Sequence, residues 1–143
     1  MANQTQVNLL LAGVDGWNDW RRETPNTSID LSGANLTRAD LSDADLSGAD
    51  LTGANLTSAI LTYADLTGAN LTRVDLSRAD LVGADLSEAN LTRANLSEAC
   101  IFGANLTRAN LTGANLTGAD FGTVNLTRPN LTDANLTGVI GLP

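Results

Sequence analysis

The side chains of this sequence that could do chemistry are carboxylates, hydroxyls and one thiol, and most of them recur at intervals of five residues. The chain of 143 residues has 16 acidic residues and no histidine, and Cys100 is its single cysteine. Without histidine, neither a Ser-His nor a Cys-His pair can form. The glycines also come at intervals of five, so no glycine-rich phosphate loop is present. We therefore expect no catalysis and no cofactor.

A metal site is the other chemistry that the carboxylates could support. Asp45, Asp65 and Asp85 are spaced by 20 residues, and we name these three the acidic column. On a flat wall each of them would offer a cation a single carboxylate, which makes a poor calcium site. A single cysteine excludes an internal disulfide and a zinc site built from cysteines, and nothing basic adjoins Cys100 to activate its thiol. We expect no metal.

The element that positions these residues is a repeat that runs from Ile29 to Gly138. Its five positions are Ala, Asp or Asn, Leu, Ser or Thr, and a variable residue, and the central apolar residue recurs from Leu31 to Leu136 in 22 copies without an insertion. Five residues advance an α-helix by about 140° and put a strand on its opposite face, so neither element would gather the leucines. A chain that bends once per repeat does, and Asn, Asp, Ser and Gly all favour bends.

The phrases Ala-Asn-Leu-Thr-Arg at residues 34–38 and Ala-Asn-Leu-Thr-Gly at residues 109–113 resemble the pentapeptide repeat family. The resemblance covers residues 29–138 and implies an all-β solenoid, a right-handed quadrilateral β-helix with one repeat per side. The 22 copies would then make about 5.5 coils. The central residue and the residue two before it would point inward. Pro129 lacks an amide hydrogen, so we expect one bond between coils to be missing there.

The chain before the repeat differs in kind. Residues 1–6 are polar, and we expect them to be frayed. Residues 7–28 are predicted to form a helical N-terminal cap and linker, because apolar residues lie at helical spacing there. Gly13 weakens a continuous helix, which predicts two short helices or one bent helix.

Both tryptophans of the chain lie in this segment. The first coil of a solenoid would otherwise expose its core to water, so the segment is predicted to cover the first leucines. The residues expected to do so are Leu10, Val14, Trp17 and Trp20. In the alternative interpretation, the two tryptophans line a ligand pocket.

The C-terminal tail, residues 139–143, is too short for a helical cap. Its Ile140 and Leu142 either fold over the last coil or pack against a second copy of the chain. The early apolar cluster at residues 9–11 is short and has no basic residue before it, and the chain has no transmembrane run. We therefore expect no signal peptide and a cytoplasmic protein.

One side of the predicted coil differs from the other three. It is centred on Leu41, Leu61, Leu81, Ile101 and Phe121, and we name it the apolar side. Most of the large apolar residues at outward positions fall on it: Ile60, Tyr63, Val82, Cys100 and Phe102. An apolar strip on a polar rod is typical of a contact surface. Alternatively, these side chains lie along the wall and cover their neighbours.

The net charge of −8 argues against direct binding to nucleic acid or to anionic membranes. The acidic residues at the second repeat position lie mostly in the N-terminal half, and from Asn90 onward this position is almost always Asn. Stacked carboxylates repel by about 1 kcal/mol per pair in water, and asparagines would relieve this repulsion. The acidic half is either a functional field or ordinary solubility charge.

Two functions are compatible with these features. The first is a non-catalytic structural or protein-interaction module, a rigid rod that binds an unknown protein partner or associates with itself through one side or through its C-terminal end. The second follows from the resemblance, because some pentapeptide repeat proteins bind DNA gyrase as acidic mimics of duplex DNA. This chain departs from those proteins in its leucine centres, its shorter rod and its lack of a C-terminal dimerisation helix.

Overall fold

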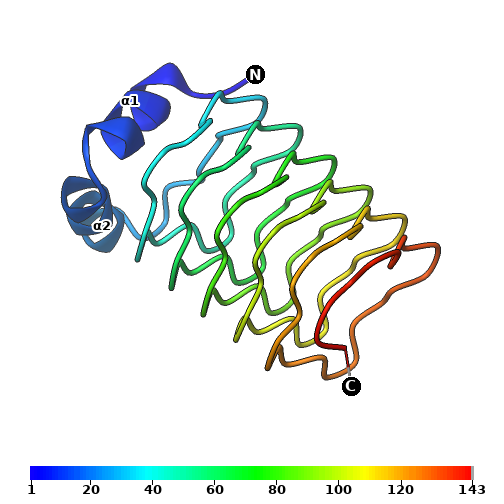
Figure 1. Cartoon of the computed structure of the whole chain (residues 1–143). Coiled ribbons are helices and arrows are strands. Elements are labelled where there is room, and N and C mark those ends of the chain that lie inside the picture. The colour runs from blue at the N-terminus through cyan, green and yellow to red at the C-terminus, as the bar shows by residue number, and fades with distance from the viewer. Residues whose placement is uncertain (143) are drawn as a thin grey trace.

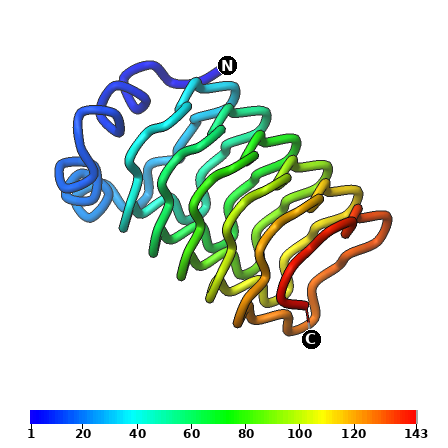
Figure 2. Tube along the Cα trace, viewed as in Figure 1, coloured from blue at the N-terminus to red at the C-terminus, as the bar shows by residue number. Residues whose placement is uncertain are grey.

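The computed structural model describes residues 1–142. Its two helices, α1 (Gln4–Ala12) and α2 (Val14–Glu23), lie at the N-terminal end of a stack of coils (Figure 1). From Asp30 to Ile140 the chain winds into successive four-sided coils, and the C-terminus lies at the far end of the stack (Figure 2). The helices therefore cover one end of the solenoid, and the last coil forms the other end.

The sides of consecutive coils are joined by short parallel β-bridges, each between residues 20 positions apart. On the apolar side, for example, the Leu61 N–H donates to the Asp80 carbonyl (2.7 Å) and the Tyr63 N–H donates to the Val82 carbonyl (2.9 Å). The Asp80 N–H donates back to the Ala59 carbonyl (2.9 Å). These bonds confirm a coil of 20 residues with one repeat on each side.

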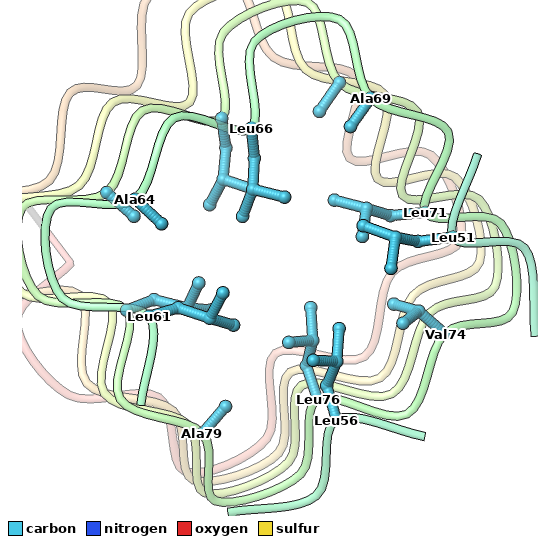
Figure 3. Close-up of a cluster of buried hydrophobic side chains, with 14 of the residues drawn as sticks. Leu51, Leu56, Leu61, Ala64, Leu66, Ala69, Leu71, Val74, Leu76 and Ala79 are labelled. Carbon is cyan, nitrogen blue, oxygen red and sulfur yellow. The ribbon is translucent and has the colours of Figure 1, made fainter. Parts of the chain in front are cut away.

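The core consists of columns of leucines with small residues between them. Leu51 lies directly over Leu71 and Leu56 over Leu76, and all four side chains point into the tube (Figure 3). From Leu31 to Phe121 the central residues are at most 1% exposed. Full burial of such a side chain stabilises the fold by about 1.5–3 kcal/mol, so the repeated leucines are the main source of stability.

Each corner is a β-turn that the repeat residues close from both sides. Within the turn, the Ala64 N–H donates to the Leu61 carbonyl (3.0 Å), and the variable residue Tyr63 has a φ of 58°. A positive φ at this position is typical of a type II turn, which explains the many glycines there. Outside the turn, Asp75 Oδ1 accepts hydrogen bonds from the N–H (3.0 Å) and Oγ (2.7 Å) of Ser77. The Asp or Asn and the Ser or Thr of each repeat thus form one hydrogen-bonded unit.

Pro129 does not remove a bond between coils, which corrects the expectation from the sequence. The amide at its position in the repeat closes the corner within its own coil, as the Ala134 N–H does by donating to the Leu131 carbonyl (3.0 Å). The missing hydrogen therefore leaves the corner between Leu126 and Pro129 without its closing hydrogen bond. The coil keeps its register, since the Asn130 N–H still donates to the Ala109 carbonyl (2.9 Å).

The cap consists of two short helices that meet at Gly13. Leu10 and Trp17 are buried, while Val14 and Trp20 are half-buried against the core. The Trp17 and Trp20 rings pack together with their centroids 5.2 Å apart. No helix in residues 1–142 is long and apolar enough to cross a membrane. The segment predicted as a helical cap thus forms helices that cover the first coil.

Residues 3–6 are not frayed, which corrects the boundary expected at Val7. The helix α1 begins at Gln4, and the Asn3 N–H donates to the Asp30 carbonyl (2.8 Å). The Gln6 side chain is buried; its Oε1 accepts from the Asp30 N–H (2.8 Å) and its Nε2 donates to the Ser28 carbonyl (3.0 Å). The first coil has an unpaired backbone edge, and these polar residues are ordered because they pair with it.

The last coil has no comparable cover within residues 1–142. Its central leucines are half-exposed, and their N–H groups have no hydrogen-bond partner in this part of the chain. These leucines are Leu126, Leu131 and Leu136. The solenoid therefore ends in an open coil.

The tail does not fold over this open coil, which corrects the first of the two alternatives for Ile140 and Leu142. The Ile140 N–H donates to the Ala119 carbonyl (2.9 Å), so Ile140 extends the wall of the apolar side. Its side chain is 63% exposed, and that of Leu142 is 39% exposed. Pro143, also part of the predicted tail, lies outside the described residues.

Candidate interaction surface

The structure places the five apolar residues singled out in the sequence on one side of the solenoid. Each of them belongs to a repeat centred on the apolar side, and the bridges stack these repeats over one another. Ile60, Tyr63 and Phe102 are exposed, at 39%, 65% and 46%, whereas Val82 and Cys100 are half-buried. The strip is thus continuous along the coils, and three of its side chains are accessible to a partner.

The second repeat position on this side alternates between acidic and apolar residues. The bridges run from Asp40 to Ile60, Asp80, Cys100 and Asp120 in turn. Carboxylates in this column are two coils apart, about 10 Å, where adjacent coils are about 5 Å apart. Ile60 and Cys100 have no oxygen to accept the hydrogen bond that closes the corner, which costs about 1 kcal/mol at each site. The apolar side therefore gives up polar contacts that the other sides keep.

The two aromatic rings of the apolar side lie over glycines of the next coil. A Cβ added to Gly83 would lie 2.4 Å from Cε1 of Tyr63, and one added to Gly122 would lie 2.6 Å from Cδ2 of Phe102. Each glycine comes 20 residues after its aromatic partner, a signal in the sequence that our reading of the apolar residues missed. One face of each ring covers the wall, and the rest of the ring faces outward.

The acidic column lies on consecutive coils of the neighbouring side, where bridges join Asp45 to Asp65 and Asp65 to Asp85. Burial of Asp45 raises its pKa, but hydrogen bonds from Ser47 and the positive charge of Arg21 outweigh burial and hold the pKa below its ordinary value. Nη2 of Arg21 lies 3.4 Å from Oδ1 of Asp45. The first carboxylate of the column is therefore tied to the cap.

Arginines interrupt the acidic surface further along the rod. Arg78 pairs with Glu98, and Arg108 pairs with Glu88, each across neighbouring coils. All four side chains are more than half exposed, and such surface pairs contribute about 0–1 kcal/mol. Their effect on the surface is larger than their effect on stability, because they break the run of negative charge.

The described residues show no second kind of chemical site. Within residues 1–142, no three His, Cys, Asp or Glu side chains gather as metal ligands would. Cys100 is a free thiol and is half-buried in the wall. The surfaces with a distinct character are thus the apolar side, the acidic column and the two ends of the rod.

A stack of four-sided coils held by parallel bridges defines a quadrilateral β-helix, the class expected from the resemblance. The family model for pentapeptide repeats matches residues 34–73, 69–108 and 104–140. The chain belongs to the pentapeptide repeat family. A search of curated protein sequences found no match.

Solved structures of pentapeptide repeat proteins from plants and cyanobacteria are similar to this chain. One from the thylakoid lumen of Arabidopsis thaliana is 43% identical, with 68% of each chain covered and a TM-score of 0.66. HetL from Nostoc sp. strain PCC 7120, a protein involved in the regulation of heterocyst differentiation, is 36% identical over 77% of this chain and 60% of its own, with a TM-score of 0.62. A further pentapeptide repeat protein from Nostoc is 43% identical over 52% of this chain and 62% of its own, with a TM-score of 0.52.

Proposed function

We propose that this chain is a non-catalytic protein-interaction module and that its apolar side binds a protein partner. The observation that carries the proposal is the exposure of Ile60, Tyr63 and Phe102 on one side of a rod whose other walls are polar. Contiguous exposed apolar residues on a soluble fold are typical of contact surfaces. No rival chemical site in residues 1–142 offers a different role.

The packing of the two rings supports this role. Because Tyr63 and Phe102 lie over Gly83 and Gly122, their orientations are set before a partner arrives. A side chain that is already ordered loses less conformational entropy on binding, so more of its contact energy remains as affinity. Aromatic side chains are also enriched among the residues that dominate binding energy.

The variants Tyr63→Ser and Phe102→Ser test the proposal, alone and combined. We expect the double variant to lose affinity capture of a partner from the native cell, or self-association in sedimentation, while its circular dichroism spectrum stays unchanged. Arg93→Ser is the matched control, because Arg93 has a φ of 57° at the same repeat position as Tyr63 but on another side. If capture and sedimentation are the same for all variants, the apolar side is merely a packed wall.

The acidic column favours a second candidate, the binding of DNA gyrase by mimicry of duplex DNA. Three carboxylates on consecutive coils form a regular line of negative charge. The pairs Arg78–Glu98 and Arg108–Glu88 break that line in later coils, so we rank this function second. A gyrase supercoiling assay decides between the two. Inhibition or drug protection at micromolar protein would support mimicry, and its absence would leave the interaction module alone.

Self-association through the C-terminal end is also part of the proposal. The half-exposed leucines of the last coil and their free N–H groups would both be covered by a second copy. Replacing Leu131 by Asp should lower the sedimentation coefficient if this contact forms. A coefficient that does not change would remove this contact from the proposal.

We expect the cytoplasm as the compartment, although a similar plant protein is from the thylakoid lumen. Fractionation of the native cell with an antibody to the chain tests this expectation directly. Recovery in a lumenal or periplasmic fraction would contradict it.

A further inference from the structure

The backbone edge of the first coil is paired with the cap on some sides and free on the apolar side. Trp17 Nε1 donates to the Asp45 carbonyl (2.8 Å), and Asn18 Oδ1 accepts from the Asp45 N–H (2.8 Å). On the apolar side, the N–H of Asp40 and the carbonyls of Asp40 and Ser42 have no hydrogen-bond partner within residues 1–142. The cap thus leaves one donor and two acceptors of this edge unused.

These free groups face a groove of about 730 Å³ between the first coil and the junction of α1 and α2. Leu9, Leu11 and Val14 line its cap side, and Leu11 is 52% exposed. The lining includes the carboxylates of Asp15 and Asp40 and no basic residue. We name this hollow the cap groove. It combines an apolar wall, a negative rim and an open strand edge.

The next coils show what would complete such an edge. One coil further along, two N–H groups two residues apart donate to the carbonyls of Asp80 and Val82, and the Asp80 N–H donates to a carbonyl of the same neighbouring segment. Asp40 and Ser42 hold the corresponding positions at the edge of the first coil. An extended segment laid on this edge could form the same three bonds, as peptides do when they add a strand to a sheet.

We propose that the cap groove binds an extended peptide segment of a partner protein. The segment pairs with the backbone of Asp40 and Ser42, places an apolar side chain against Leu11 and Val14, and sets a basic side chain beside Asp40. Free groups in the bonding pattern of a strand favour a peptide over a small apolar molecule, which would leave them unpaired. The negative rim favours a basic residue.

The charge of Asp40 is well defined. Hydrogen bonds from the Ser42 hydroxyl (2.7 Å) and the Ser42 N–H (3.1 Å) hold the pKa of Asp40 below its ordinary value. The carboxylate is therefore ionised at neutral pH and available to a basic side chain. This site is separate from the five residues of the apolar side, so it stands whether or not that side binds a partner.

The probe is the peptide acetyl-Thr-Ala-Arg-Leu-Thr-Gly-amide, which copies one repeat with Arg in place of Asp or Asn. In the bonding pattern of the coils, its Leu and Gly amides donate to Asp40 and Ser42, and its Arg lies beside Asp40. Titration of the full chain, followed by amide NMR shifts, should move the signals of residues 40–43 first. An analogue methylated at the Leu and Gly nitrogens should bind at least about tenfold more weakly, because both donors are lost.

Protein variants separate the apolar wall from the charge. We expect Leu11→Ser to weaken the probe by about tenfold or more. Asp40→Asn keeps the oxygen that Ser42 bonds to, and it should weaken the Arg probe severalfold without affecting an analogue with Gln in place of Arg. Phe102→Ser, far along the apolar side, is the control and should leave the affinity unchanged.

Several outcomes would overturn the proposal. One is the absence of shifts at residues 40–43 with the probe at millimolar concentration. Another is equal affinity for the methylated analogue, which would mean that the groove takes apolar groups without pairing its edge. A dimer of the chain that dissociates on Leu11→Ser would assign the groove to a second copy instead. The comparison of the two peptides uses the unmodified protein, so it holds even if a variant fails to fold.

Discussion

The two ends of the coil stack present the same kind of surface, yet only one of them is covered. Any coil end exposes central apolar residues and a row of backbone N–H and carbonyl groups. At the N-terminal end, Trp17 is fully buried, while Gln6 and Asn18 pair with the backbone of the first coil. At the C-terminal end, the leucines of the last coil are half-exposed and their amides are unpaired within residues 1–142.

The difference shows that covering a solenoid end takes two kinds of contact. Apolar side chains remove the central residues from water, and polar side chains satisfy the backbone edge. The cap supplies both over most of the first coil. The tail supplies neither, because Ile140 and Leu142 remain exposed. We therefore expect the first coil to be stable and the last coil to open most easily.

Deletion of residues 1–24 should have the largest effect. It removes both helices of the cap and exposes the leucines of the first coil, so we expect aggregation or the loss of a cooperative thermal transition. Sedimentation and thermal circular dichroism measure both. Removal of residues 141–143 is the control and should change little. A soluble, cooperatively folding product of the large deletion would contradict the role of the cap.

Trp17→Ala should destabilise the chain by about 3–5 kcal/mol, the usual range for a large buried aromatic residue. Trp17 also donates a hydrogen bond to the Asp45 carbonyl. Trp20→Ala is the matched comparison, and a smaller loss is expected because Trp20 is only half-buried. Urea unfolding gives both free energies. Equal losses for the two variants would argue against Trp17 as the main plug of the first coil.

The same substitution in the middle and at the open end should differ in effect. Leu71→Ala removes a fully buried side chain and should cost about 2–5 kcal/mol. Leu131→Ala acts on a half-exposed residue and should cost about half as much, since less apolar surface leaves the core. Urea unfolding of both variants checks this. If Leu131→Ala costs as much as Leu71→Ala, something covers the last coil in solution.

The smallest expected effect is the pH dependence of the contact between the cap and Asp45. The pKa of Asp45 is held below the ordinary value of 3.8 in the folded chain. The resulting stabilisation is present above that value and is lost as the pH falls through the folded pKa. Asp45→Asn should flatten the acid loss of stability by less than about 1 kcal/mol, because the exposed contact is screened. Unfolding free energies measured from pH 7 to about pH 3 test this, and a native chain with the same pH profile as the variant would contradict it.

The central architecture could be predicted from the sequence because it depends on one interval. Leucines 20 residues apart, such as Leu51 and Leu71, lie over one another because every repeat has the same length and the same corner chemistry. The division of the cap at Gly13 was also predictable, since glycine weakens a continuous helix. Periodicity and local propensity were sufficient for these features.

Other features depend on contacts that no local pattern shows. Gln6 looks like part of a polar, frayed end, yet it is buried because its amide pairs with the backbone of Asp30, 24 residues away. The corner role of Pro129 followed from the direction of one amide, which the repeat alone does not specify. The cap groove depends on how two helices sit on the first coil, and only the structure shows which side of that edge is left free.

Native-state amide hydrogen exchange tests the central claim most directly, because it reports each end of the rod separately. If the cap closes the N-terminal end and the last coil is open, the Asp30 and Asp45 amides exchange slowly and those of Leu126, Leu131 and Leu136 exchange fast. Fast exchange at Asp30 and Asp45, or strong protection at the three leucines, would contradict the account.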